Sequence, residues 1–265
     1  MPDFLGRPGP TPWHRLAPLT KLVVAVATAV AAVLLGGIAG PLLLVLVAVV
    51  VPARAAGVLR RLLTLSLLLS LPIAASALLV NLFFYPGGED VLFQIGPISA
   101  TAEGLVLALQ TLARILAISG AITLFYLTTR PSDLVLDLER RGVSARVGFV
   151  ANASVQTVPA MLDRANAIIA AQRARGLDTQ ASAWKRIRGL VPIVGPVIMG
   201  AIGQVEERTM ALEARGFTRP GRRTLLWTPD DSSRQRLARW IIVLGVLALG
   251  VARATGLLSS LPGID

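Results

Sequence analysis

Long apolar runs dominate the pattern of hydrophobic and polar positions along this chain. A helix needs ~20 mostly apolar residues to cross ~30 Å of hydrocarbon. Three runs reach that length, at residues 62 to 84, 104 to 127 and 240 to 260. We predict one membrane-spanning helix for each of them.

A fourth apolar run extends from Leu22 to Pro52 and allows more than one interpretation. The sequence GGIAGP, at residues 36 to 41, could be a turn between two short spans or a weak point in one long span. Residues 22 to 35 could also belong to a cleavable signal peptide. The hydrophobic pattern does not separate these possibilities, but the distribution of charge does.

Charges alternate between the segments that connect the apolar runs. Short cytoplasmic loops carry an excess of Lys and Arg, and residues 1 to 21 and 54 to 61 each hold three bases, with one acid in the first and none in the second. Residues 85 to 103 hold three acids and no base, so they look external. If residues 1 to 21 and 54 to 61 are both cytoplasmic, the chain between them crosses the membrane an even number of times. We therefore predict two short spans in residues 22 to 53. We predict a multi-pass protein of the cell membrane, with five spans, a cytoplasmic N-terminus and an external C-terminus.

The composition supports an all-α membrane protein and removes several chemistries. Of the 265 residues 54% are hydrophobic and 15% charged, and the mean hydropathy is +0.68, which is too apolar for a soluble domain of this length. The chain has no cysteine and only one histidine, His14. Disulfides, thiolate metal sites and cysteine catalysis are therefore excluded. A lone imidazole beside a membrane entry is more often an interfacial residue than a metal ligand.

Charged residues concentrate between the fourth and fifth predicted spans. Residues 128 to 239 hold 18 of the 26 Lys and Arg residues and 10 of the 15 Asp and Glu residues. We divide the chain into a four-span region at 1–127, a cytoplasmic coupling region at 128–233 and a C-terminal span at 234–265. The coupling region opens with a short amphipathic helix, which we expect to start at Thr129 before a proline and to stop at Gly142.

Two longer helical patterns follow in the coupling region. Apolar and small residues recur at spacings of three and four from Val155 until the pattern stops at Gly176, and again from Val197 to Gly216. We expect a break between the two helices at the sequence VPIVGP, residues 191 to 196. Both patterns contain too many charged residues to cross lipid comfortably, so we expect two long helices on the cytoplasmic side.

The two long helices end in the same three residues, in AQRARG (171–176) and ALEARG (211–216). Glycine is the commonest residue just past a helix end, and a cation in the last turn complements the helix dipole, so capping explains each copy taken alone. A guanidinium beside a small residue also offers a fork of donors that matches a carboxylate. The repetition therefore predicts a partner-binding site made of Ala174, Arg175, Gly176, Ala214, Arg215 and Gly216.

With these motifs the chain resembles the transmembrane coupling component, or T component, of energy-coupling factor transporters, a family that also contains the membrane component of cobalt and nickel uptake systems. The paired Ala-Arg-Gly ends carry the resemblance most strongly. The sequence PWHRLAPLTKL (12–22) is similar to the family's entry to the first span, and TTRPSDL (128–134) to its helix start after the fourth span. Ala17 stands where an acid is usual, so this chain lacks that acid.

The resemblance implies a non-catalytic subunit of an ATP-driven importer. In such transporters the T component holds two ATP-binding cassette ATPase subunits, and arginines in the positions of Arg175 and Arg215 dock near acidic residues of those ATPases. The long helices also cradle a membrane-embedded substrate-binding S component, which releases a vitamin or a transition-metal ion inside. ATP and magnesium would then bind to the ATPases, and this chain would hold no cofactor. The sequence agrees, because it contains no G-x-x-x-x-G-K-[ST] phosphate loop.

Two other functions use the same residues differently. A basic membrane scaffold or sensor would bind anionic lipid or nucleic acid through its cytoplasmic arginines, but acids interleave with those bases, which favours a specific protein partner at the membrane and no nucleic acid. A polytopic prenyl- or phosphotransferase could chelate magnesium pyrophosphate with Asp230 and Asp231. No further carboxylates accompany that pair at helical spacing, so we expect the two aspartates to cap the last helix.

Four further residues interrupt the predicted helices. Arg114 lies inside the fourth span, where a charge is costly, and we expect it to face Gln110 or an S component. Arg253 lies near an end of the last span and is expected to extend toward the membrane surface. Pro72 and Pro159 are expected to kink their helices.

Overall fold

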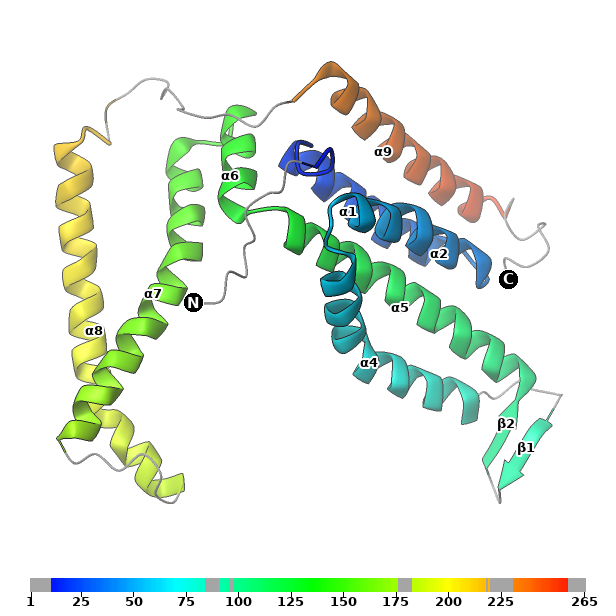
Figure 1. Ribbon diagram of the computed structural model, residues 1–265, viewed down its shortest axis with the longest axis horizontal. Coiled ribbons are helices and arrows are strands. Elements are labelled where there is room, and N and C mark those ends of the chain that lie inside the picture. The colour runs from blue at the N-terminus through cyan, green and yellow to red at the C-terminus, as the bar shows by residue number, and fades with distance from the viewer. Residues whose placement is uncertain are drawn as a thin grey trace. The chain divides into compact units, whose positions relative to one another are not determined.

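The computed structural model describes residues 11–83, 91–95, 98–175, 183–217, 219 and 231–256. These residues form two compact units that are described separately. The membrane unit contains the described residues up to Arg141 and those from Asp231 on, and the hairpin unit contains the described residues between Gly142 and Arg219. Nearly all of the regular structure is helical (Figure 1), which confirms the all-α prediction.

The helices of the membrane unit follow the predicted apolar runs. Among the described residues, three helices are long and apolar enough to cross a membrane: α4 (Leu59–Phe83), α5 (Ala102–Thr128) and α9 (Ser233–Ala254). Two shorter apolar helices precede them, α1 (Pro18–Leu34) and a helix over Ala39–Ala55. The run that begins at Leu22 is therefore divided as predicted, and Gly37 turns the chain with a φ of 65°.

The second short helix contains a wide π-helical segment. It consists of α2 (Ala39–Leu44), the π-helix η1 (Val45–Val50) and α3 (Val51–Ala55). The side chain of Val49 is buried against α5, where an added Cβ on Gly120 would lie 2.9 Å from its Cγ1 atom. Gly120 thus permits the close contact of the two helices, as small residues do in membrane helix packing.

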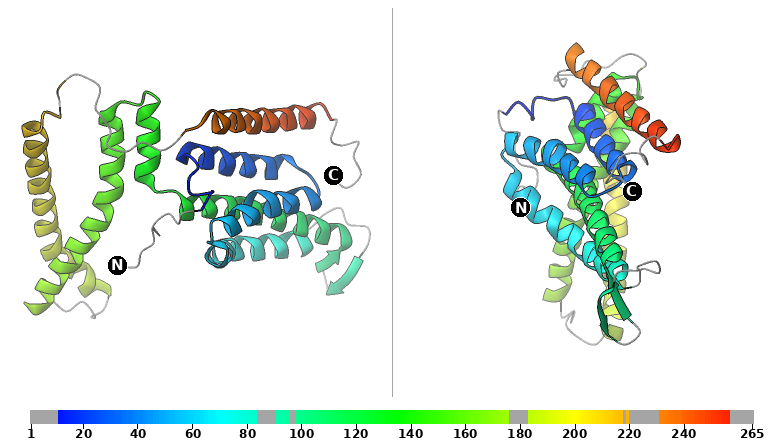
Figure 2. Two further views of the ribbon diagram at one scale, coloured as in Figure 1. Left: turned by 45° about the horizontal axis from the view of Figure 1, so that its top comes forward. Right: turned by 90° about the vertical axis from the view of Figure 1, so that its right-hand side faces the viewer.

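Helix α5 has α4 on one side and α1 on the other, and α9 lies against α1 (Figures 1 and 2). Two short antiparallel strands, β1 (Val91–Ile95) and β2 (Ile98–Thr101), connect α4 to α5. The sequence did not predict them. Thr101 then caps α5, because its Oγ1 accepts a hydrogen bond from the Gly104 amide at 3.2 Å.

A short helix, α6 (Pro131–Arg140), follows α5 within the membrane unit. Its proline stands at the first helical position, and Gly142 stops it with a φ of 109°, so the predicted stop is confirmed. The predicted start at Thr129 is one residue too early, because Arg130 is the N-cap and Thr129 is the C-cap of α5. The boundaries of the coupling region at residues 128 and 233 concern function and stay a prediction.

The hairpin unit consists of α7 (Ala145–Ala174) and α8 (Ala183–Ala214). The predicted break at residues 191–196 is wrong, because α8 is continuous through both prolines of that sequence. A proline removes one backbone hydrogen bond and bends a helix without always ending it, and Figure 1 shows α8 bent in its first part. Pro72 and Pro159 likewise lie inside α4 and α7, and both of these helices change direction along their length (Figure 1).

Candidate partner-binding site

The end of α7 exposes Arg175. Ala174 is the last helical residue and Arg175 occupies the C-cap, with φ −88° and ψ 10°. Its backbone N–H donates to the Gln172 carbonyl at 3.1 Å, and its side chain is exposed. Gly176 lies outside the described residues, so its role in stopping this helix stays a prediction.

The end of α8 forms a Schellman turn around Gly216. This glycine has a φ of 68°. Residues with a Cβ atom are destabilised in this conformation, whereas glycine adopts it readily. The Gly216 amide donates to the Glu213 carbonyl and the Phe217 amide to the Leu212 carbonyl, both at 2.9 Å, which is the bond pair that defines the motif. The predicted helix stop at Gly216 is therefore confirmed, and the exposed side chain of Arg215 lies on the turn.

An aromatic pair holds this turn against the start of α7. The rings of Phe217 and Phe149 meet edge to face with their centroids 4.9 Å apart, an arrangement that aromatic rings favour. The contact fixes the position of Arg215 relative to both helices. Sequence analysis missed the pair, although an apolar residue just after a C-terminal glycine is a recognised companion of the Schellman turn.

A groove with polar and apolar lining residues lies on the hairpin beside Arg215, with a volume of about 240 Å³. Its polar lining residues are Arg208 on α8, Arg215 just after α8, and Asn152 and Gln156 on α7. Arg208 Nη1 donates to the Thr157 hydroxyl at 3.3 Å, so it also joins the two helices. The groove offers hydrogen-bond donors of the kind that bind a carboxylate. Sequence analysis did not single out Arg208.

The two arginine-bearing ends lie at opposite ends of the hairpin. Contacts between α7 and α8 pair Phe149 with Phe217, and Arg164 with the Gly200 carbonyl at 2.8 Å, so the helices are antiparallel (Figure 1). Arg215 therefore lies beside the start of α7 and Arg175 at its far end. At ~1.5 Å of rise per residue, roughly 35 Å separate them along the helix, so one small partner surface does not cover both.

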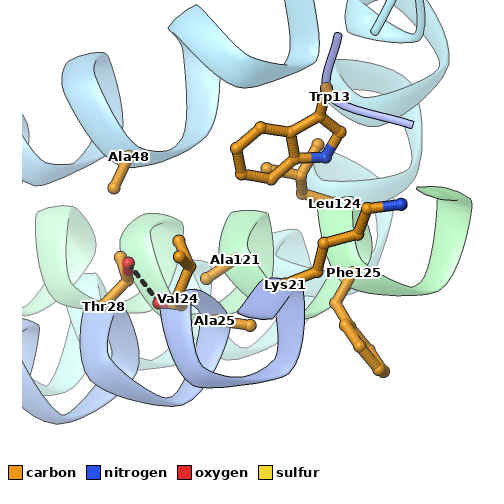
Figure 3. Close-up of a pocket in the computed structure, with 9 residues that line it drawn as sticks. All are labelled: Trp13, Lys21, Val24, Ala25, Thr28, Ala48, Ala121, Leu124 and Phe125. Carbon is orange, nitrogen blue, oxygen red and sulfur yellow. Dashed lines mark hydrogen bonds between the residues drawn. The ribbon is translucent and has the colours of Figure 1, made fainter. Parts of the chain in front are cut away.

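The N-terminal motif has a structural role in the membrane unit. Lys21 is only 5% exposed and donates to the Thr128 carbonyl at 3.0 Å and the His14 carbonyl at 3.4 Å. Trp13 Nε1 donates to the Thr128 hydroxyl at 3.3 Å. Figure 3 shows both side chains beside Leu124 around a small space, and at about 10 Å³ this space holds at most one water molecule. The motif therefore ties the start of α1 to the end of α5.

His14 lies in the same N-terminal segment, beside Thr11. Its Nδ1 lies 2.6 Å from the Thr11 hydroxyl. Burial, and to a smaller extent the charge of Lys21, lower the pKa of His14 below its ordinary value. Among the described residues no three His, Cys, Asp or Glu side chains gather as metal ligands would.

The two arginines inside predicted spans have different surroundings. Arg253 is exposed in the last turn of α9, in agreement with a side chain that extends toward the membrane surface. The Arg114 side chain is half-buried on α5, and its Nε has no hydrogen-bond partner in the described part of the chain. Whether Arg114 faces Gln110 or an S component stays a prediction.

Asp231 does not cap α9 as the sequence predicted. Ser232 is the N-cap, and its hydroxyl accepts from the Gln235 amide at 3.3 Å. The carboxylate of Asp231 instead binds Arg239 and Arg141, with shortest distances of 2.9 and 2.8 Å. The hydrogen bonds from Arg239, helped by the charges of both arginines, hold the pKa of Asp231 below its ordinary value. Asp230 lies outside the described residues.

Comparison with known proteins gives one consistent result. A family described as cobalt transport protein matches residues 9–225 of the chain. A protein of Listeria innocua named energy-coupling factor transporter transmembrane protein EcfT is 30% identical over 190 residues, which cover 68% of each chain. The protein of the same name from Lactococcus lactis is 29% identical over 248 residues, which cover 86% of this chain and 91% of that protein. The one from Thermosediminibacter oceani is 27% identical over 256 residues, covering 92% and 93%.

Proposed function

Because the chain belongs to the cobalt transport protein family, and within it to the T components of energy-coupling factor transporters, we propose that it passes the work of ATP hydrolysis from two partner ATPases to a substrate-binding S component. The chain itself performs no catalysis in this proposal. It holds no cofactor, and ATP and magnesium bind to the ATPases. The imported substrate is a vitamin or a transition-metal ion.

One observation carries the proposal: two exposed arginines stand at opposite ends of an antiparallel helix pair. Arg175 and Arg215 each follow directly after the last residue of a helix, Ala174 in α7 and Ala214 in α8. A guanidinium that loses water at a protein interface is often a dominant contributor to binding. Two separated ends suit two copies of a partner that each present a carboxylate. The groove lined by Arg208 and Arg215 enlarges the binding surface at one of the two ends.

The hairpin also exposes many apolar side chains, which supports an S component as the second kind of partner. An extensive exposed apolar surface indicates contact with protein or lipid. The residues with at least half of their surface exposed include Val150, Val158, Leu162, Ile198, Met199, Val205 and Met210. A membrane-embedded protein would cover such side chains more favourably than water does. The charge distribution predicts that the N-terminus and the hairpin are cytoplasmic. The hairpin unit then meets the ATPases on the side of the membrane where ATP is present.

Co-purification tests the proposal directly. The chain is expressed with the ATP-binding cassette ATPases encoded in the same genome, and each ATPase is quantified after purification of this chain in detergent. We expect Arg175→Ala and Arg215→Ala each to reduce recovery, and the double variant to abolish it, while Arg173→Ala and Arg219→Ala serve as matched controls. Both control arginines are exposed and lie within a few residues of the tested ones.

Two outcomes would contradict the proposal. Undiminished recovery with the double variant would show that these helix ends do not hold the ATPases. Equal losses from Arg173→Ala and Arg175→Ala would instead indicate general attraction to positive charge, as a basic membrane scaffold that binds anionic lipid would show.

A further inference from the structure

An ion pair joins the end of α6 to the start of α9, the two helices of the membrane unit between which the hairpin lies in the sequence. The chain leaves the membrane unit at Arg141 and is again within it at Asp231. Although 90 positions separate them, Arg141 Nη2 lies 2.8 Å from Asp231 Oδ2. The residue that follows α6 and the residue that precedes the N-cap of α9 are thus held together by opposite charges.

Asp231 extends this contact to the starts of α9 and α1. Arg239 donates to both carboxylate oxygens of Asp231, at 2.9 and 3.1 Å, which is the bidentate geometry that binds most specifically. Arg239 is 7% exposed, and its Nη1 also donates to the Thr20 hydroxyl at 2.8 Å. A side chain of α9 therefore connects the carboxylate to α1.

Asp137 completes the connection from α6. Its Oδ1 lies 3.3 Å from Arg141 Nε, and its Oδ2 accepts the Leu19 amide at 3.2 Å. The side chain of Asp137 is 1% exposed. Since Ala17 gives α1 no side-chain cap, Asp137 supplies from another helix the acceptor that the start of α1 needs.

The cluster alternates two acids with two bases, and each is paired. Asp137, Arg141, Asp231 and Arg239 sum to zero formal charge, and removal of one member would leave a neighbour charged and partly buried without its partner, which is strongly unfavourable. Arg236 is peripheral by contrast, because its Nε lies 3.7 Å from Asp231 and its side chain is 61% exposed. The helix ends are therefore held in one specific arrangement.

We propose that Arg141, Asp231 and Arg239 are positioning residues, a clamp that binds both connections of the hairpin to α1, α6 and α9 so that a displacement of the hairpin is passed to the membrane helices. The inference rests on the proposed coupling function. A flexible attachment would absorb such a displacement, whereas a paired and largely buried cluster moves as one body. The clamp connects three helix ends within the membrane unit and acts without touching the ATPases.

The first measurement tests the clamp without any partner. The chain has no cysteine, so spin labels on Glu139→Cys in α6 and Arg234→Cys in α9 report only these two positions. We expect one narrow distance distribution in the otherwise unchanged chain, roughly twofold broadening with Asp231→Asn because buried charges lose their partner, and recovery with Asp231→Glu. Arg236→Gln is the matched control and should stay narrow. An unchanged distribution with Asp231→Asn would overturn the clamp.

The second measurement tests transmission in the complex with the ATPases. Labels on Ser154→Cys in α7 and Leu247→Cys in α9 are compared before and after ATP and vanadate are added, with cysteine-free ATPases. We expect the distance to change in the labelled parent and in Arg236→Gln, and the change to be lost in Asp231→Asn and Arg141→Gln although both variants still recover the ATPases. A response equal to that of the parent would overturn transmission through the clamp.

The two measurements separate the inference from the proposed function. If the parent chain recovers no ATPase, the proposed function fails, while the α6 to α9 distances still decide whether the clamp exists. If both Asp231→Asn and Arg141→Gln prevent folding or ATPase recovery, the cluster is a folding element and the proposal of a positioning role is overturned.

Discussion

At the scale of single residues, Asp231 shows why the chemistry of this chain is only partly visible in its sequence. The pair Asp230-Asp231 before an apolar run is typical of a helix cap, and local pattern rules support that reading. The structure gives the cap to Ser232 and places Arg141, 90 positions away, on the carboxylate. Such a contact depends on how α6 and α9 pack, which no local pattern encodes. The placement of Arg175 and Arg215 at helix ends, by contrast, could be predicted because a helix end is a local feature.

The pKa of Asp231 leads to a prediction about acid stability. Arg239 first, then Arg141, lower this pKa below its ordinary value of 3.8, and Arg236 also faces the carboxylate. The Asp231 carboxylate therefore takes up a proton at a higher pH in the unfolded chain than in the folded one. Its ion pairs contribute fully to stability at a pH above the ordinary pKa of the group, and this contribution is lost as the pH falls through the lower pKa of the folded state. We expect the unfolding temperature of the protein in detergent to exceed that of Asp231→Asn most at neutral pH.

The same difference should shrink as the pH falls below ~4, where the carboxylate begins to protonate in the unfolded chain. Asp163→Asn is the matched control, because Asp163 is exposed on α7, and it should stay close to the parent throughout. A difference in unfolding temperature between the parent and Asp231→Asn that stays constant from neutral to strongly acidic pH would contradict this prediction.

At the scale of the elements, the apolar runs and the turn glycines were reliable guides. The apolar helices, the division of the run from Leu22 to Pro52 and the stop of α6 at Gly142 were predicted, because burial in lipid and the φ angle of a turn act on neighbouring residues. The break at residues 191–196 was not found, since two prolines bend α8 without ending it. The strands β1 and β2 were missed because they are short and lie between much stronger helical signals.

The Schellman turn at the end of α8 provides a paired prediction. Gly216→Ala places a side chain in the left-handed region and should cost ~1–2 kcal/mol of stability. Gly203→Ala, in the interior of the same helix with nothing within 4 Å of the added carbon, should instead gain ~0.5–1 kcal/mol, because glycine weakens a helix interior. Thermal unfolding followed by helical circular dichroism measures both. Equal shifts of the same sign would contradict the assignment of Gly216 to the cap.

At the scale of the whole molecule, the sequence separates a membrane part from a charged part, and the structure shows a membrane unit and a helical hairpin. The interleaved charges predicted a folded segment that recognises a partner. They did not reveal that α7 and α8 are antiparallel, which puts Arg175 and Arg215 at opposite ends. That arrangement comes from contacts such as Phe149 with Phe217, between residues that are distant in the sequence.

The predicted topology can be tested with the chain in its membrane. A cysteine at Ser154, exposed on α7, should react with a membrane-impermeant thiol reagent in inside-out vesicles and stay unlabelled in intact cells, because the arginine-rich segments are expected inside. A cysteine at Glu89, in the acidic loop, should show the opposite pattern. Labelling of the Ser154 position from outside intact cells would contradict the proposed coupling to cytoplasmic ATPases.

The most direct test of the central claim is site-specific photo-crosslinking at the two helix ends. A photoreactive residue replaces Arg175 or Arg215 in cells that also make the ATP-binding cassette ATPases of the same genome, with Arg173 and Arg219 as control positions. We expect a covalent product between this chain and an ATPase from each of the two ends, and weaker or no product from the control positions. Products that join these ends only to the chain itself or to lipid, with no ATPase captured from either end, would contradict the central claim.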